Sequence, residues 1–293
     1  MRTTCMRALL ADAVDLEAYF QRIGYTGPRT DAASLETLAA IHRLHPSAIA
    51  FETLDALLKR PVILTAAALE QKLLHGGRGG WCFEQNLLLS RVLQSLGFGI
   101  TGLAARVLWN RPDGEMRART HMLLLVEGSP GGPYIADVGF GGLTLTGPLR
   151  LVPDVEQATP HEVFCLRRRL DGTYVLQVLI AEAWKPMYSF DLQPQVLPDY
   201  EVWNWHLCHH PESPFVNNLM VARVTPERRY GLFNNRLSVH HRQGDSEQLT
   251  LATAAELRAT LEDSFNIRLP DDPGLGALLE RLVGHNARTE GKL

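Results

Sequence analysis

The stretch Arg78-Gly-Gly-Trp-Cys82-Phe-Glu-Gln-Asn86 places a cysteine directly after a glycine-rich loop and at the start of a helical pattern. We expect the helix to run from about Cys82 to Leu96 and to stop at Gly97. Unpaired backbone N–H groups and the positive end of the helix dipole lie at such a start. This setting favours a reactive thiolate. Most free cysteines are small buried hydrophobes, however, so a catalytic role for Cys82 depends on its partners.

The sequence on both sides of this stretch changes its periodicity. Residues 1–97 show apolar positions at spacings of three and four, as in 16–23 and 35–44, which predicts a small helical bundle. Residues 98–205 show a period of two in several runs separated by glycine-rich turns, which predicts an antiparallel, strongly bent sheet or small barrel. Residues 206–293 mix strands and helices. The fold class is therefore α+β.

Composition excludes several functional classes. The 293 residues exceed the roughly 100–200 residues of one domain, so two or three packed subdomains are expected. A hydrophobic content of 45%, a charged content of 21% and a net charge of -3 are ordinary for a soluble protein and give nucleic acid no basic surface. The N-terminal apolar run is too short for a signal peptide, and no stretch approaches a membrane span. We therefore expect a cytoplasmic protein.

Cysteine usage points away from disulfides and structural zinc. The four cysteines are scattered and form no CxxC pair, in a chain large enough to fold without cross-links. The run from His206 to His210 has residue types that suit zinc. If it is extended, successive side chains point to opposite faces, so one ion could collect few of them. We predict no metal. The cysteines are Cys5, Cys82, Cys165 and Cys208.

A hairpin supplies the partners that a nucleophilic thiol needs. If the strand that begins at His121 turns through Gly128-Ser-Pro-Gly-Gly132, residues whose numbers sum to about 258–260 face each other. His121 then lies opposite Asp137 or two residues from it, and both side chains point to one face. An inward-facing Asp137 is costly unless it is paired. Cysteine, imidazole and carboxylate together predict a catalytic triad.

These blocks resemble those of the arylamine N-acetyltransferases. The shared blocks are Arg78–Asn86, Thr120-His121 before an apolar strand, and Asp137-Val-Gly-Phe-Gly141, in the same order. The resemblance implies a helical bundle, a central antiparallel β-barrel and a C-terminal α/β lid with a papain-like cysteine catalytic core. It also implies Cys82 as nucleophile, His121 as base and Asp137 as orienting carboxylate. Supporting blocks at 19–24, 49–55 and 204–215 extend it to most of the chain.

The implied reaction is a ping-pong transfer from acetyl coenzyme A, through an acetyl-cysteine, to an arylamine, arylhydrazine or hydrazide. Phe51, Phe140 and Phe215 match positions that line the acceptor pocket, and flat amines stack well on rings. Each of these residues also fits an ordinary core position. Gly139, Gly141 and Gly142 could approach coenzyme A or form a tight turn. Glu52 and Arg78 match a buried ion pair that braces the loop before Cys82.

Alternatives stay open at this level. The same triad suits a hydrolase or amide synthase, because papain-like cysteines also attack amides. A non-catalytic binding protein with this fold is a third reading, against which the intact triad argues. The sequence departs from the family pattern at Ala50-Phe-Glu-Thr53, where a structural turn is expected to change slightly. It also departs at Cys208-His-His-Pro211, where the lid would approach the cleft, and this departure affects acceptor preference more than the core chemistry.

Overall fold

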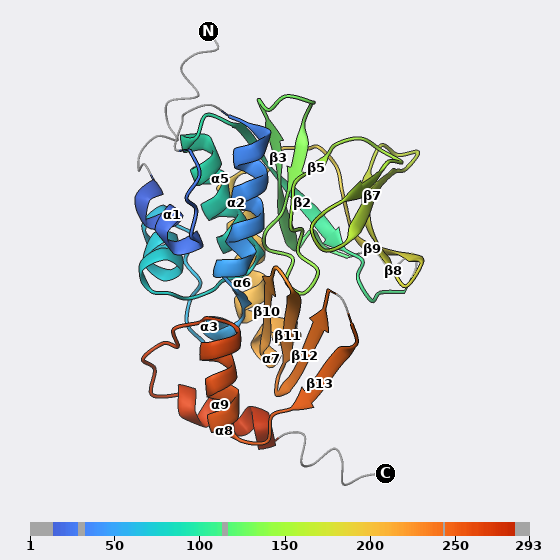
Figure 1. Ribbon diagram of the computed structural model, residues 1–293. Helices are drawn as coiled ribbons and strands as arrows, with labels where there is room; N and C mark the ends of the chain where they lie inside the picture. The colour runs from blue at the N-terminus through green and yellow to red at the C-terminus, as the bar shows by residue number, and fades with distance from the viewer. Residues whose placement is uncertain (1–13, 29–32, 113–116, 243, 285–293) are drawn as a thin grey trace.

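The computed structural model describes residues 14–28, 33–112, 117–242 and 244–284 and arranges them around two antiparallel sheets (Figure 1). Cys5 and the N-terminal run considered as a signal peptide lie outside these ranges. Within them, no helix is both long enough and apolar enough to cross a bilayer. Cys82, Cys165 and Cys208 are buried free thiols.

The N-terminal helices form where the apolar spacing predicts them. Ser34 begins the long helix α2 by accepting a hydrogen bond from the Thr37 N–H, and Gly24 ends α1 in a left-handed conformation with φ 69°. Helix α5 begins at Cys82, as predicted, and nine of its 14 residues are buried. The helices are α1 (Leu16–Ile23), α2 (Leu35–Ala48), α3 (Leu54–Leu57), α4 (Ala66–Leu69) with a π-helical extension (Glu70–His75), and α5 (Cys82–Ser95).

The larger sheet has eight strands in the order β5-β4-β3-β2-β9-β8-β7-β6 and forms a nearly closed barrel. Its edge strands β5 and β6 are linked through Gln157, whose side-chain amide accepts from the Arg150 N–H at 2.8 Å and donates to the Arg150 carbonyl at 2.9 Å. The antiparallel barrel is thus confirmed. The strands are β2 (Gly99–Val107), β3 (His121–Glu127), β4 (Tyr134–Ala136), β5 (Leu149–Arg150), β6 (Glu156–Ala158), β7 (Val163–Arg168), β8 (Tyr174–Ile180) and β9 (Ala183–Phe190).

The smaller sheet has five strands in the order β1-β10-β11-β12-β13, and Figure 1 shows it below the barrel with α8 and α9 beside it. Thr253 caps α8 by accepting from the Glu256 N–H, as its position before the helix suggests. The elements are β1 (Phe51–Glu52), β10 (Met220–Thr225), β11 (Arg228–Phe233), β12 (Arg236–His241), β13 (Ser246–Thr250), α6 (Leu197–His209), α7 (Pro214–Asn217), α8 (Ala254–Ala259) with a π-helical extension (Thr260–Ser264), and α9 (Leu275–Gly284).

Two elements differ from the predicted pattern. The period of two was expected to last until about residue 205, but α6 already begins at Leu197. Its buried residues Tyr200, Asn204 and Leu207 recur at helical spacing. Strand β1, expected within a helical region, has two residues, too few for a period to be visible, and pairs Phe51 with Ala222. The division at 97/98 and 205/206 stays a prediction, and these two elements connect its parts.

Candidate active site

Cys82, His121 and Asp137 lie together where the first turn of α5 meets the start of β3 and the loop after β4. Their exposed fractions are 4%, 3% and 0%, so the chemistry of the group is shielded from bulk water. His121 Nε2 lies 2.7 Å from Asp137 Oδ2, and the imidazole also hydrogen-bonds to Cys82. Because Nε2 faces the carboxylate, Nδ1 is the ring nitrogen available to the thiol. The three side chains therefore have the connectivity of a nucleophile, a base and an orienting acid.

The hairpin that joins His121 to Asp137 has the register expected from the sequence. Leu124 pairs with Ala136 and Val126 pairs with Tyr134. The residue numbers of each pair sum to 260, which lies within the predicted range of about 258–260. Asp137 follows directly after β4, where the strand has ended. The imidazole and carboxylate thus meet diagonally across one face of the hairpin.

Asp137 is buried but fully satisfied. Its Oδ1 accepts hydrogen bonds from Asn86 Nδ2 and from the Gly139 N–H, each at 3.0 Å. Burial alone would raise the pKa of Asp137, but the His121 charge and these hydrogen bonds lower it below its usual value. The side chain is therefore a carboxylate at neutral pH. The sequence analysis assigned no role to Asn86, although it ends the first motif. Its position four residues after Cys82, on the same helix face, is the signal that could have identified it.

The contact between Asp137 and His121 also controls the charge of the His121 imidazole. Burial lowers the pKa of His121, but Asp137 and the hydrogen bonds to Asp137 and Cys82 outweigh it and raise the pKa to about 10. The imidazole is therefore protonated at neutral pH and loses its proton only as the pH rises through that value. A cationic imidazole beside a thiol stabilises the thiolate.

A network of buried charges braces the loop before Cys82. Arg78 donates to Glu52 Oε1 from Nε at 2.9 Å and from Nη2 at 2.6 Å, which confirms the predicted pair. Asp55 accepts from Arg78 at 3.0 Å, and Lys72 lies 2.7 Å from Asp55 and 2.6 Å from Glu84. The sequence identified only two of these five groups, through the resemblance to the family, because no local pattern marks the other three. The network is wider than a single ion pair.

Glu84 connects this network to the nucleophile. Its Oε2 accepts the Trp81 N–H at 3.0 Å, which satisfies the last backbone donor before α5. Its Oε1 accepts from Lys72 at 2.6 Å. Trp81 is also held at its ring, since Nε1 donates to Asn204 Oδ1 at 3.1 Å. The peptide that precedes Cys82 is therefore fixed from both sides.

The three predicted phenylalanines lie on two sides of the triad and are each half-buried. Phe140 packs edge-on against His121 with ring centroids 5.2 Å apart. Phe51 contacts Phe215 at 5.9 Å, and Phe215 stacks on Trp81 at 5.2 Å. Trp81 was not singled out as an aromatic contributor, although it precedes the nucleophile. We call the connected rings of Phe51, Phe215 and Trp81 the aromatic wall. That the three phenylalanines line an acceptor pocket stays a prediction.

The three predicted glycines have different surroundings. A Cβ on Gly139 would lie 2.6 Å from Cys82 Cα, so the loop needs glycine there to approach the nucleophile. Gly141 has φ +90° and lies against the Phe51 ring, whereas Gly142 is exposed with open space around its Cβ position. Contact with coenzyme A stays a prediction for all three. The close approach of Gly139 is a structural requirement of the site itself.

Gly139→Ala should lower kcat/KM about 100-fold, because the added methyl group must displace the backbone that carries Cys82. The measurement is the initial rate of acetyl transfer, with the folded fraction matched by circular dichroism. Gly231→Ala on β11 is the control, since nothing lies within 4 Å of its Cβ position. A wild-type rate for Gly139→Ala would show that the two backbone segments are not tightly packed.

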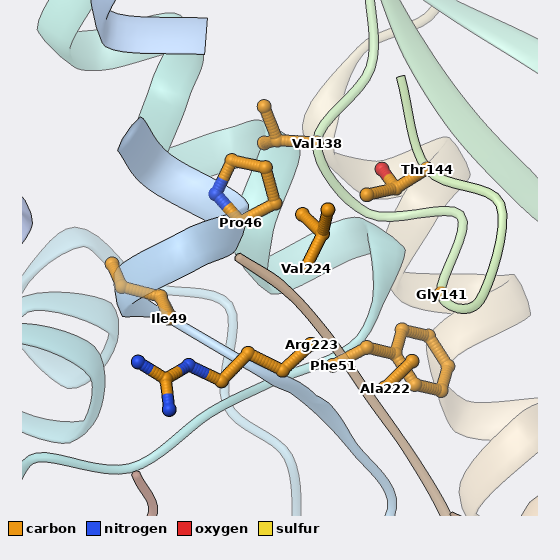
Figure 2. Close-up of a pocket in the computed structure, with 9 residues that line it drawn as sticks. All are labelled: Pro46, Ile49, Phe51, Val138, Gly141, Thr144, Ala222, Arg223 and Val224. Carbon is orange, nitrogen blue, oxygen red and sulfur yellow. The ribbon is translucent and has the colours of Figure 1, made fainter. Parts of the chain in front are cut away.

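A small pocket adjoins the aromatic wall (Figure 2). It lies between the end of α2, β1, β10 and the loop after β4. In Figure 2 the Arg223 guanidinium points away from the other lining residues, and its Nε donates to the Ser47 carbonyl at 2.7 Å. The pocket shares Phe51 and Gly141 with the site, but its described lining contains no triad member. It is lined by Pro46, Ile49, Phe51, Val138, Gly141, Thr144, Ala222, Arg223 and Val224.

The cluster from His206 to His210 is not extended, so the argument from alternating faces was wrong. Its first four residues end helix α6, and His206 stacks on His210 one turn later with centroids 4.5 Å apart. Cys208 is buried, and burial raises the pKa of its thiol to about 11. Among the residues that the structure describes, no three His, Cys, Asp or Glu side chains are grouped to hold a metal ion.

Comparison with known proteins agrees with this geometry. The sequence profile of an N-acetyltransferase family matches residues 34–273. The chain is 42% identical to an arylamine N-acetyltransferase of Mycobacterium tuberculosis over 283 residues, which is 95% of this chain and 98% of the relative. It is 40% identical to the Escherichia coli arylamine N-acetyltransferase over 87% of this chain and 90% of the relative.

Solved structures show the same similarity. The M. tuberculosis arylamine N-acetyltransferase superposes with a TM-score of 0.86 at 40% identity, covering 91% of this chain and 100% of the other. The Mycobacterium marinum enzyme in complex with CoA gives a TM-score of 0.86 at 40% identity, covering 92% of this chain and 99% of the other. The chain is thus an acyltransferase, and it belongs to the arylamine N-acetyltransferase family.

Proposed function

We propose that this enzyme transfers the acetyl group of acetyl coenzyme A to arylamines, arylhydrazines or hydrazides through an acetyl-Cys82 intermediate. The observation that carries the proposal is the buried Cys82–His121–Asp137 group, with 2.7 Å between His121 Nε2 and Asp137 Oδ2. The names of the similar proteins, and the CoA complex of one of them, support the substrate classes.

In the first half-reaction, the Cys82 thiolate attacks the carbonyl carbon of the thioester. The new S–C bond forms as the bond to the coenzyme A sulfur breaks, and the leaving thiolate receives the proton of the His121 imidazolium. The Cys82 N–H lies in the first turn of α5, where N–H groups have no partner within the helix, and is the candidate oxyanion donor. The Trp81 N–H is already bound to Glu84.

In the second half-reaction, the amine nitrogen attacks the carbonyl carbon of acetyl-Cys82. His121, now neutral, accepts the amine proton, while the thiolate of Cys82 leaves and Asp137 keeps the ring oriented. The aromatic ring of the acceptor stacks against Phe140, Phe51 and Phe215. Gly142 offers room for coenzyme A, because it is exposed and its Cβ position is open.

The direct test is an intact-mass spectrum after incubation with acetyl coenzyme A and removal of the excess donor. We expect a single acetyl adduct, located on the peptide that contains Cys82, which an added arylamine removes with formation of the acetylated amine. Loss of the adduct to water at a rate that the arylamine does not change would instead indicate a hydrolase. Absence of any adduct would refute the acetyl-cysteine route.

A further inference from the structure

Helix α2 carries two imidazoles, His42 and His45, that are both 0% exposed although they lie in a helix whose other buried residues are mostly apolar. They lie three residues apart and contact different elements: His45 contacts α5 through Gln85, and His42 contacts the loop after β4. Buried polar groups are retained when they make hydrogen bonds that the structure needs. The partners of each ring show what it does.

His45 supports the loop before the nucleophile. Its Nε2 lies 2.7 Å from Gln85 Oε1, and its Nδ1 lies 2.8 Å from the Tyr19 hydroxyl. The amide nitrogen of Gln85 donates to three backbone carbonyls, including that of Gly80 at 3.1 Å. The Gln85 oxygen is therefore an acceptor, so His45 carries its proton on Nε2. This ring stabilises the loop and does not reach the triad.

His42 makes the opposite kind of contact. The Asp137 backbone N–H points at His42 Nε2 with 3.0 Å between the nitrogens. A peptide N–H can only donate, so Nε2 must be the acceptor and the proton of this neutral ring lies on Nδ1. Burial lowers the pKa of His42 to about 4, which keeps the acceptor available at neutral pH.

This contact takes the place of a missing strand partner. The described pairing of β3 with β4 ends at Ala136, so the ladder does not include the Asp137 N–H. Asn86, Gly139 and His121 hold the two carboxylate oxygens, whereas His42 holds the peptide group from which the side chain projects. The orientation of that peptide sets where the carboxylate meets His121.

We propose that His42 is a positioning residue for the reaction: by accepting the Asp137 N–H, it fixes the peptide plane that aims the carboxylate at His121. This inference rests on the proposed triad mechanism. It assigns the helical bundle a part in aligning the acid of the triad, in addition to carrying the nucleophile.

The test compares two amides at this position. In His42→Gln the side-chain oxygen reaches about as far as Nε2, so the hydrogen bond is kept; in His42→Asn the side chain is one methylene shorter and falls short of Asp137. We expect the glutamine variant to keep most of the acetylation rate and the asparagine variant to lose about 10- to 100-fold in kcat, with KM for acetyl coenzyme A unchanged. The alkaline limb of the kcat profile should move below the pH of about 10 set by His121 only in His42→Asn.

Ile41→Ala is the matched control, because Ile41 is 0% exposed on the same helix and its truncation loosens the core without touching the hydrogen bond. Equal rates and equal alkaline limbs for the glutamine and asparagine variants would overturn the inference, as would the same shift in Ile41→Ala. The acetyl adduct of the wild-type enzyme is scored in parallel. If that adduct is missing, the mechanism itself fails; if it forms and the two amide variants behave alike, only the role of His42 fails.

Discussion

Cys82→Ala should abolish acetyl transfer, with a loss of at least about 10⁴-fold in kcat, because no other group at the site can hold the acetyl group. The substitution removes only the sulfur atom of a side chain that is 4% exposed. Cys82 is the first residue of α5, and the rest of the helix is unchanged. The fold should therefore be retained. Release of coenzyme A thiol, followed with a thiol reagent in the presence of an arylamine, measures the loss.

Cys165→Ala is the matched control for this experiment. Cys165 is likewise a buried free thiol, 1% exposed, but it lies on β7 of the barrel, outside the triad. We expect it to keep its activity and its single acetyl adduct. Turnover by Cys82→Ala at the wild-type rate would contradict the nucleophile assignment, and an adduct that disappears in Cys165→Ala would transfer the role to that residue.

Arg78→Met should destabilise the protein by about 3–5 kcal/mol, because it removes the guanidinium partner of the buried Glu52 carboxylate. Arg78 is 7% exposed, and its guanidinium contacts Glu52 Oε1 at 2.6 Å and Asp55 Oδ1 at 3.0 Å. Methionine cannot donate to either carboxylate, and because Lys72 stays 2.7 Å from Asp55, the loss falls mainly on Glu52. The midpoint and slope of urea unfolding, followed by circular dichroism, give the free energy of unfolding.

Arg167→Met separates this effect from the general loss of an arginine. Arg167 Nη1 lies 2.9 Å from Asp154 Oδ1, a comparable distance, but the two side chains are 44% and 60% exposed. Solvent screens such a pair, so its unfolding midpoint should stay close to that of the wild type. Similar destabilisation by both variants would mean that burial of the Arg78 network contributes nothing.

The parts of the structure that the sequence predicted are those set by local pattern. The start of α5 at Cys82 follows from the glycine loop and the helical spacing, and the pairing of His121 with Asp137 follows from a short turn and strand parity. Both inferences needed only residues within about 20 positions of each other along the chain.

The parts that were missed depend on contacts between different elements, which no local pattern marks. Lys72, Asp55 and Glu84 form one network only once the folded chain brings them together, and the two residues of β1 have no period to detect. His42 and His45 did leave a signal, because they occupy the apolar face of a predicted helix next to Ile41. Their hydrogen-bond partners lie on α5 and after β4, which no local pattern reveals.

The pairing of β1 with β10 has a consequence for synthesis on the ribosome. Phe51 and Glu52 flank the nucleophile loop, yet their strand partners are Ala222 and Val221. A nascent chain can form the helices of its first third early, and the β1 segment can bond to the loop at Gly80, but β1 lacks its strand partner until those residues have left the exit tunnel. The aromatic wall next to Cys82 is therefore completed late in translation, so that an unfinished chain does not yet hold a finished acetylating centre.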